Sequence, residues 1–181
     1  MAVTEIKFGG FGGQGVILAG MIVGKAAALY DNKEATLTQA FGPEARGSAC
    51  SAQVVVSDSR ILYPYVNRPQ IMMLMSQDAF MRFSPELAKG GVLVIEEDLV
   101  KPEPLPEGAT VFKAPATRIA EELGRRMVLN IVMVGFFAAV TKILSPEAVR
   151  KAVKDSVPKG TIDLNLKAFD RGFECGKQIA N

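Results

Sequence analysis

Two kinds of apolar stretch alternate along this chain. Short uninterrupted runs occur at Ile71–Met75 (IMMLM) and Val92–Ile95 (VLVI). Continuous apolar runs of this length are typical of strands that helices bury on both faces of a parallel sheet. Other segments repeat their apolar residues every three or four positions, which is the spacing of a helix that buries one face. The pattern therefore predicts strands alternating with helices.

The predicted elements fill most of the chain. Strands are expected at residues 5–8, 35–41, 50–57, 71–75, 92–95 and 110–113. Pro64 demotes 61–66 to an edge or bent segment. Helices are expected at residues 16–30, 77–89, 117–144, 146–157 and 164–179. Ser84-Pro85 interrupts the second of these and can start another short helix. This order predicts an α/β fold, a Rossmann-like three-layer domain with a mostly parallel sheet flanked by helices. A length of 181 residues fits a single domain over residues 1–181.

The longest predicted helix, 117–144, has a nearly all-apolar centre, MVLNIVMVGFFAAV, at residues 127–140. That centre is shorter than the roughly 20 residues needed to span a bilayer, so a core or interface helix is favoured over a membrane anchor. Asn130 interrupts it. Because an unpaired buried amide costs about 1–3 kcal/mol, Asn130 should either tie down a loop or touch a ligand, and the loop tie is favoured.

A glycine-rich loop lies between the first strand and the first helix. Gly10, Gly12 and Gly15 fit the pattern G-x-G-x-x-G, and Gly13 and Gln14 lie within it. Glycines let a backbone approach a ligand closely, and the start of a helix offers unpaired N–H groups that suit a phosphate or carboxylate. The loop is therefore a candidate anion site. The alternative is that its glycines only let the helix pack tightly on the sheet.

A standard NAD site is not expected at this loop. Such a site needs an acidic residue at the end of the second strand to hold the ribose hydroxyls. The second predicted strand ends in Gln39, Ala40 and Phe41, whereas Asp31 and Glu34 precede it. The sequence thus has the loop and lacks the ribose clamp.

Two charged segments are further candidates. Arg46, in the loop 42–48 (GPEARGS), could bind a phosphate or carboxylate with its planar guanidinium, or it could pair with Glu44. The acidic run 96–98 could bind a metal ion, but such a run is more often the solvated end of a strand.

The composition excludes several kinds of chemistry. The chain has no histidine, and its two cysteines, Cys50 and Cys175, are far apart. This rules out histidine-dependent triads and the usual thiolate ligation of an iron–sulfur cluster. The net charge of +2 is dispersed, so no nucleic-acid partner is expected. The N-terminus has no signal-peptide pattern, which favours a cytoplasmic protein with reduced thiols.

Four segments together resemble one protein family. They are FGGFGGQGVILAG (8–20), FGPEARGS (41–48), MSQDAF (75–80) and LNIVMVG (129–135). In this combination and spacing they resemble the gamma subunits of 2-oxoacid:ferredoxin oxidoreductases, over nearly the whole chain. The chain is most similar to the 2-oxoglutarate type, because it is short and carries no fused ferredoxin-like domain. One departure is Gly47-Ser48, where family members often have two glycines.

The resemblance implies a reaction and a set of partners. Such complexes oxidatively decarboxylate a 2-oxoacid, reduce ferredoxin and form an acyl-coenzyme A, using thiamine diphosphate, magnesium and 4Fe-4S clusters. This chain has no thiamine-type G-D-G motif and no cluster cysteines. The resemblance therefore assigns catalysis to alpha, beta and, where present, delta subunits, and leaves this chain without catalytic residues or metal ligands.

The cofactor contacts expected in this chain are to an anion or coenzyme A, and they involve Gly10, Gly12, Gly13, Gln14, Gly15 and Arg46. Two alternatives stay open. One is the equivalent subunit of a pyruvate, branched-chain 2-oxoacid or indolepyruvate enzyme. The other is a stand-alone nucleotide-binding module.

Overall fold

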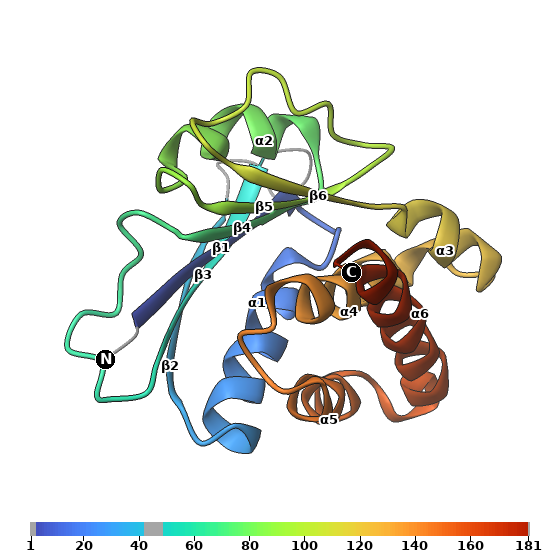
Figure 1. Ribbon diagram of the computed structural model, residues 1–181. Helices are drawn as coiled ribbons and strands as arrows, with labels where there is room; N and C mark the ends of the chain where they lie inside the picture. Colours follow the sequence, from blue (N-terminus) through green and yellow to red (C-terminus); the bar gives the residue numbers. More distant parts are fainter. Residues whose placement is uncertain (1–2, 42–48, 181) are drawn as a thin grey trace.

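The computed structural model describes residues 3–41 and 49–180, which form a six-stranded sheet with helices on both faces (Figure 1). The strands are β1 (Val3–Phe11), β2 (Glu34–Ala40), β3 (Ala49–Ser57), β4 (Ile71–Leu74), β5 (Val92–Glu96) and β6 (Thr110–Ala114). Their order in the sheet is β2-β3-β1-β4-β5-β6. Strands β1, β4, β5 and β6 are parallel, while β3 is antiparallel to both β1 and β2. The predicted α/β fold with a mostly parallel sheet is confirmed.

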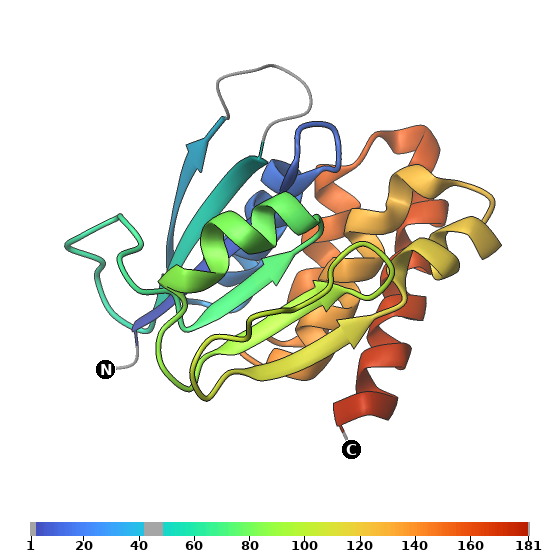
Figure 2. The ribbon, with the colours of Figure 1, turned by 90° about the horizontal axis from the view of Figure 1, so that it is seen from above.

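The helices divide unequally between the two faces of the sheet (Figures 1 and 2). They are α1 (Val16–Lys25, continued by a π-helical turn, Ala26–Tyr30), α2 (Gln77–Phe83), α3 (Ala116–Glu122), α4 (Leu129–Thr141), α5 (Pro146–Ser156) and α6 (Ile162–Ala180). Helix α2 covers one face, and α1, α4, α5 and α6 lie on the other. A 3₁₀ turn at Ser84–Glu86 follows α2, as Pro85 predicted.

Alternate side chains of the central strands enter different cores. On β4, Met72 and Leu74 pack with α2, whereas Ile71 and Met73 join the larger core on the opposite face. This alternation follows from the two-residue period of a strand. Because helices cover both faces of the sheet at β4, every side chain of this strand is buried, which explains its uninterrupted apolar run.

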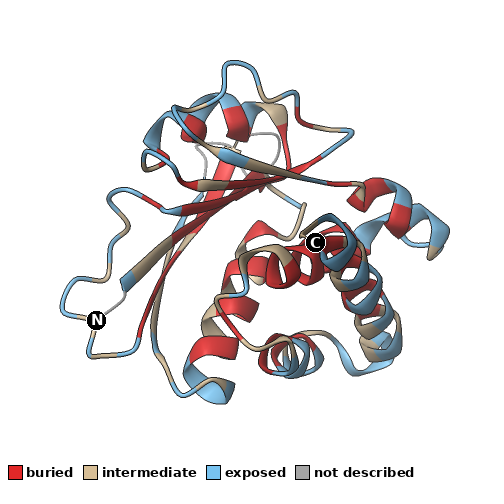
Figure 3. Ribbon diagram, viewed as in Figure 1, coloured by how far each residue is buried: buried red, intermediate tan, exposed pale blue. Residues whose placement is uncertain are grey.

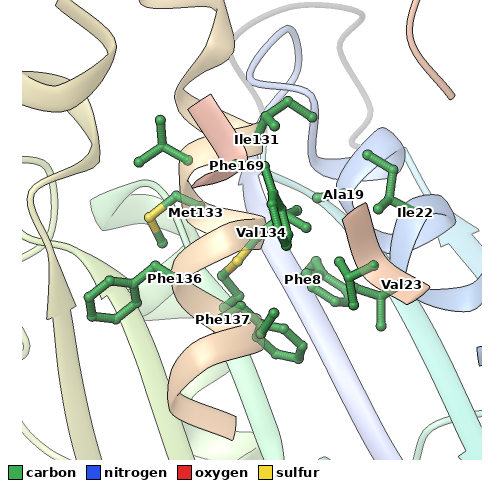
Figure 4. Packing of buried hydrophobic residues seen from close by; sticks show 14 of the residues in the cluster. Phe8, Ala19, Ile22, Val23, Ile131, Met133, Val134, Phe136, Phe137 and Phe169 are labelled. Carbon is green, nitrogen blue, oxygen red and sulfur yellow. The ribbon is translucent and has the colours of Figure 1, made fainter. Parts of the chain in front are cut away.

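Helix α4 lies at the centre of the larger core, and its ribbon is buried along nearly its whole length (Figures 3 and 4). The ring of Phe137 on α4 meets that of Phe8 on β1, with centroids 5.5 Å apart. The prediction of a core helix is confirmed. No helix in the described ranges is long and apolar enough to cross a membrane.

Helices α4 and α6 touch through their backbones. A Cβ atom added at Gly135 would lie 2.1 Å from the carbonyl oxygen of Phe169, and one added at Gly172 would lie 2.0 Å from that of Val132. Neither site has room for a side chain. Glycine at these positions is therefore a requirement of the helix–helix contact.

Two details of the predicted elements are wrong, and one alternative that the sequence left open, at 61–66, is decided. The helix expected at 117–144 is two helices, because the chain turns at Gly124 (φ +77°) and a 3₁₀ turn, Arg126–Val128, precedes α4. The segment 61–66 forms no strand. Strand β1 continues to Phe11, so Gly10 lies in the sheet, opposite Cys50 of β3, and not in the loop.

Candidate functional site

The candidate site is the crevice at the carboxyl ends of β1 and β4. These strands are neighbours and parallel, but α1 follows β1 onto one face of the sheet while α2 follows β4 onto the other. Open α/β sheets bind ligands at such a switch point, where the two connections diverge. The glycine-rich loop forms one wall of this crevice.

A pocket of about 490 Å³ lies in the crevice, and segments from several elements form its walls. The lining comes from the glycine loop, the end of β4 with the start of α2, the loop after β5, and the 3₁₀ turn before α4. Its residues are Phe11, Gly13, Gln14, Met75, Ser76, Gln77, Leu99, Arg126, Met127 and Leu129. The wall is mostly apolar, with amides and one guanidinium among the polar groups.

Gln14 fastens the glycine loop. Its side-chain oxygen accepts a hydrogen bond from the backbone N–H of Phe11 (2.7 Å), and its side-chain nitrogen donates to the carbonyl oxygen of Met75 (2.9 Å). A Cβ atom at Gly10 would lie 2.6 Å from the same side-chain oxygen of Gln14. Gly10 therefore makes room for a side chain that links β1 to β4.

Asn130 fastens the other end of the loop. This residue of α4 is 4% exposed, and its side-chain nitrogen donates to the carbonyl oxygen of Gly15 (3.3 Å). Gly15 has φ +73°, and a Cβ atom there would lie 2.3 Å from the same nitrogen. The favoured prediction, that Asn130 ties down a loop, is confirmed.

Gly13 has open space beside it. It is exposed with φ +99°, and within the described part of the chain no atom lies within 4 Å of the place where its Cβ would be. A second pocket, of about 300 Å³, also begins at Gly13 and extends along Asn130 toward Asn165. Met127, which is 86% exposed, lines both pockets. A ligand can therefore approach the backbone at Gly13.

The start of α1 faces this opening without a side-chain cap from any described residue. Gly15 is the N-cap, and no acidic side chain occupies the first turn. The first N–H groups of a helix without a cap carry partial positive charge and attract anions. Arg125 and Arg126, which line the two pockets, add positive charge near the opening.

Arg46 and Gly12 complete the set of predicted site residues. Arg46 falls outside the described residues. The described residues on either side of its loop, Phe41 and Ala49, lie at the same edge of the sheet as the glycine loop, since Ala49 pairs with Phe11. Gly12 is in the turn that follows β1.

The sheet order gives a second reason against a standard NAD site. In that fold the second strand is adjacent to the first and carries the acid at its end. Here β3 lies between β1 and β2, and it runs in the opposite direction. The end of β2 is thus one strand further from the glycine loop.

The acidic run at 96–98 is structural, and the prediction of a solvated strand end is wrong for Glu96. This carboxylate is 0% exposed and accepts hydrogen bonds from the backbone N–H groups of Asp98, Leu99 and Thr117 at 2.7–2.9 Å. Both other acids in the run pair with Arg118. Glu96 therefore joins the end of β5 to the start of α3 beside the crevice.

The described residues include no group of three or more Cys, Asp or Glu side chains that could hold a metal ion. Cys50 and Cys175 are free thiols on β3 and α6. Burial is the main cause that raises the pKa of both thiols, so neither is an activated nucleophile.

Comparison with known proteins identifies the family. The family model described as pyruvate ferredoxin/flavodoxin oxidoreductase matches residues 5–175. The 2-oxoglutarate synthase subunit KorC of Methanocaldococcus jannaschii is 50% identical over 177 residues, which are 97% of this chain and 95% of that protein.

Solved structures agree with the sequence match. The keto/oxoacid ferredoxin oxidoreductase gamma subunit from Geobacter sulfurreducens is 38% identical with a TM-score of 0.84, over 96% of this chain and 98% of that one. The 2-oxoglutarate:ferredoxin oxidoreductase from Magnetococcus marinus, a structure with 2-oxoglutarate, coenzyme A and succinyl-CoA bound, shares the fold at 21% identity with a TM-score of 0.88. It covers 98% of this chain, which matches 32% of that longer one. The resemblance inferred from the four motifs is confirmed, and this chain belongs to the pyruvate ferredoxin/flavodoxin oxidoreductase family.

Proposed function

We propose that this chain is the gamma subunit of a cytoplasmic 2-oxoglutarate:ferredoxin oxidoreductase. The observation that carries the proposal is the 50% identity over nearly the full length of a subunit named for 2-oxoglutarate. In this proposal residues 1–181 act as one gamma-type domain, assembled with alpha, beta and, where present, delta subunits. The complex converts 2-oxoglutarate and coenzyme A to succinyl-CoA and passes the electrons to ferredoxin.

The residues of this chain do not fit the cofactors of that reaction. Thiamine diphosphate with magnesium needs carboxylate and amide ligands of the G-D-G type, and the iron–sulfur clusters need several thiolates. The chain has neither. The proposal therefore places these cofactors in the other subunits and expects the isolated chain to be inactive.

The part of the reaction that fits this chain is the handling of coenzyme A. Its phosphates would lie against the exposed backbone at Gly13 and the uncapped start of α1, with Arg46 supplying charge. Its uncharged arm would follow the apolar wall of the 490 Å³ pocket, formed by Phe11, Met75 and Leu99. Gly10, Gln14 and Gly15 take part indirectly, because they hold the loop in shape.

The test uses the assembled complex and two matched glycine variants. Gly13→Ala adds a methyl group where the ligand would approach. Gly90→Ala adds one at φ +74°, in space that is also open among the described residues but lies outside the crevice. Both variants place alanine at a positive φ, but only Gly13→Ala should raise the KM for coenzyme A, by roughly 10-fold. Equal KM values for the two variants would show that coenzyme A does not bind at this loop.

A charge variant tests the second contact. Charge-assisted hydrogen bonds contribute about 1.5–3 kcal/mol, so Arg46→Ala should weaken coenzyme A binding roughly 10- to 100-fold. Calorimetric titration of the complex with coenzyme A and with NAD measures this, and NAD should give no heat of binding. Unchanged affinity for coenzyme A in Arg46→Ala would mean that Arg46 does not contact coenzyme A and interacts only within its own loop.

Substrate assays separate the remaining candidates. The complex should oxidise 2-oxoglutarate faster than pyruvate, branched-chain 2-oxoacids or indolepyruvate. A preference for one of those acids would assign the chain to the corresponding enzyme. Recovery of the chain without any thiamine-dependent partner would favour the stand-alone nucleotide-binding module.

A further inference from the structure

We propose that the pocket of about 300 Å³ beside the glycine loop, called here the asparagine pocket, binds a planar base that carries an amino group, as adenine does. It lies between the glycine loop, the turn before α4 and the connection from α5 to α6. An adenine nucleotide supplies this chemistry either as the nucleotide end of coenzyme A or as a free nucleotide. The inference deepens the proposed function and rests on it for the first of these two sources.

Two buried asparagines carry the argument. Asn130 on α4 is 4% exposed and Asn165 on α6 is 8% exposed, and both line the pocket. The side-chain nitrogen of Asn130 donates to the carbonyl oxygen of Gly15 (3.3 Å). The side-chain nitrogen of Asn165 donates to the carbonyl oxygen of Thr161 (2.8 Å). Because a carbonyl oxygen only accepts, these two bonds fix which end of each amide is the oxygen.

The two amide oxygens are open to the pocket. No described residue donates a hydrogen bond to the side-chain oxygen of Asn130 or Asn165. Neither oxygen is sealed in the interior, because the one sealed side-chain oxygen without a partner among the described residues belongs to Thr117 on α3. Since buried polar groups are normally paired, these acceptors call for a ligand that donates N–H groups.

The rest of the pocket suits a flat ring. Leu18, Val157 and Leu164 give it apolar walls, and Met127 lies at its border with the larger pocket. A thioether packs favourably against the edge of an aromatic ring. Adenine carries an amino group, a donor, where guanine carries an oxygen, so acceptors at this place favour adenine.

The position of the asparagine pocket connects a base to phosphates. Gly13 lines this pocket and the larger one, so phosphates attached to the base would reach the exposed backbone at Gly13 and the start of α1. The described lining contains Arg125 and no acid, and the neighbouring acid Glu121 pairs with Arg126 (3.6 Å). Base and phosphate contacts side by side indicate a nucleotide.

The first measurement needs only the wild type. The full-length chain and the assembled complex are titrated with ADP and with IDP, whose base carries an oxygen in place of the amino group, and binding is followed by ligand-observed NMR. Because that oxygen would face the oxygens of Asn130 and Asn165, ADP should bind roughly 10-fold more tightly. Equal affinities, or no binding of ADP to either preparation, would overturn the inference.

The variant Asn165→Ala assigns the preference to this pocket. Loss of the acceptor should lower the ratio of the ADP and IDP affinities toward one. Loss of the bond to Thr161 weakens both nucleotides alike, so the ratio isolates the acceptor. The control is Asn67→Ala, an exposed asparagine in the connection between β3 and β4, which should keep the wild-type ratio. An unchanged ratio in Asn165→Ala would also overturn the inference.

Competition identifies the source of the base. Coenzyme A should displace ADP, and Asn165→Ala should raise the KM of the complex for coenzyme A roughly 10-fold. If ADP shows the amino-group preference and coenzyme A does not displace it, the pocket takes a free adenine nucleotide. The inference then stands, and the coenzyme A role of the glycine loop fails. If coenzyme A binds and Asn165→Ala changes neither the ratio nor the KM, the inference fails and the proposed function stands.

Discussion

Glycine has different uses in two regions of this molecule. In the contact between α4 and α6, a Cβ atom at Gly135 or Gly172 would lie within about 2 Å of a backbone carbonyl oxygen of the other helix. At the end of β1 and in the loop that follows it, a Cβ atom at Gly10 or Gly15 would first meet the end of a side chain, Gln14 or Asn130. Backbone packs against backbone in the first region, and polar side chains fill the space in the second.

This difference separates stability from function. Helix backbones cannot move without disturbing the whole core, so the α4–α6 glycines are fixed by packing. Gly10 and Gly15 leave space for the side chains of Gln14 and Asn130, which hold the turn in place. Gly13 contacts neither side chain in this way. Of Gly10, Gly13 and Gly15, which belong to the predicted anion site, Gly13 is thus the one with open space beside it among the described residues.

The largest effect is expected at the helix contact. Gly172→Ala should lower the free energy of unfolding by about 3 kcal/mol, because the new methyl group forces α4 and α6 apart. For a chain of this size that corresponds to a fall in Tm of roughly 6–12 °C, measured by circular dichroism. Gly160→Ala, a position with no described atom within 4 Å, is the matched control and should change Tm little. A similar Tm for both variants would contradict the close packing.

A smaller effect with a specific rescue is expected at Gly15. Gly15→Ala should cost about 2–3 kcal/mol, in part from the left-handed backbone and in part from the clash with Asn130. In the Asn130→Ala background the backbone strain and a 3.3 Å contact with the Cβ atom of residue 130 remain, so the same change should cost about 1–2 kcal/mol. Denaturant unfolding of the four proteins in this cycle gives the coupling energy.

The control for this cycle is Gly124→Ala. Gly124 has φ +77° and open space around it among the described residues, so its substitution carries strain without a clash. It should cost the same in both backgrounds. Strict additivity of Gly15→Ala and Asn130→Ala would mean that the amide does not occupy the position where Gly15 needs space.

Gln14 tests the other end of the loop with an intermediate effect. Gln14→Ala removes two hydrogen bonds, to Phe11 and Met75, and should cost about 1–2 kcal/mol. Gln14→Glu keeps the acceptor for Phe11 but places an oxygen against the carbonyl of Met75, so it should also destabilise. A Tm in Gln14→Glu equal to that of the wild type would show that the bond to Met75 contributes nothing.

The fold could be predicted from local patterns because strands buried on both faces have a simple signature. The apolar runs at 71–75 and 92–95 gave the central strands, and the glycine pattern gave the turn after β1. The break between α3 and α4 was missed, since Gly124 and the two arginines after it lead into an apolar run, and a helix pattern accommodates all of these residues. The antiparallel direction of β3 was also missed, because it depends on pairing between distant segments.

The sequence predicted which residues form the candidate site better than it predicted the role of each residue. A G-x-G-x-x-G pattern gives the glycines, but not which ones are filled by side chains from elsewhere in the fold. Asn130 could be inferred because a polar residue in an apolar helix needs a partner. Glu96 could not, since a buried carboxylate that binds three backbone N–H groups looks in sequence like any acidic strand end.

The smallest expected effect is a gain in stability, at Gly24. It tests whether a glycine is required by close packing or is simply present in a helix. Gly24 lies in α1, and a Cβ atom there would be 3.9 Å from Val54, an ordinary contact distance. Since glycine within a helix is less stable than alanine by about 0.5–1 kcal/mol, Gly24→Ala should stabilise the chain by that amount and raise Tm by roughly 1–4 °C. Gly20→Ala, in the same helix, should destabilise it, because its Cβ atom would lie 2.6 Å from that of Ala52 on β3. Thermal unfolding of both variants decides the point, and a loss of stability in Gly24→Ala would mean that α1 lies closer to β3 than the structure places it.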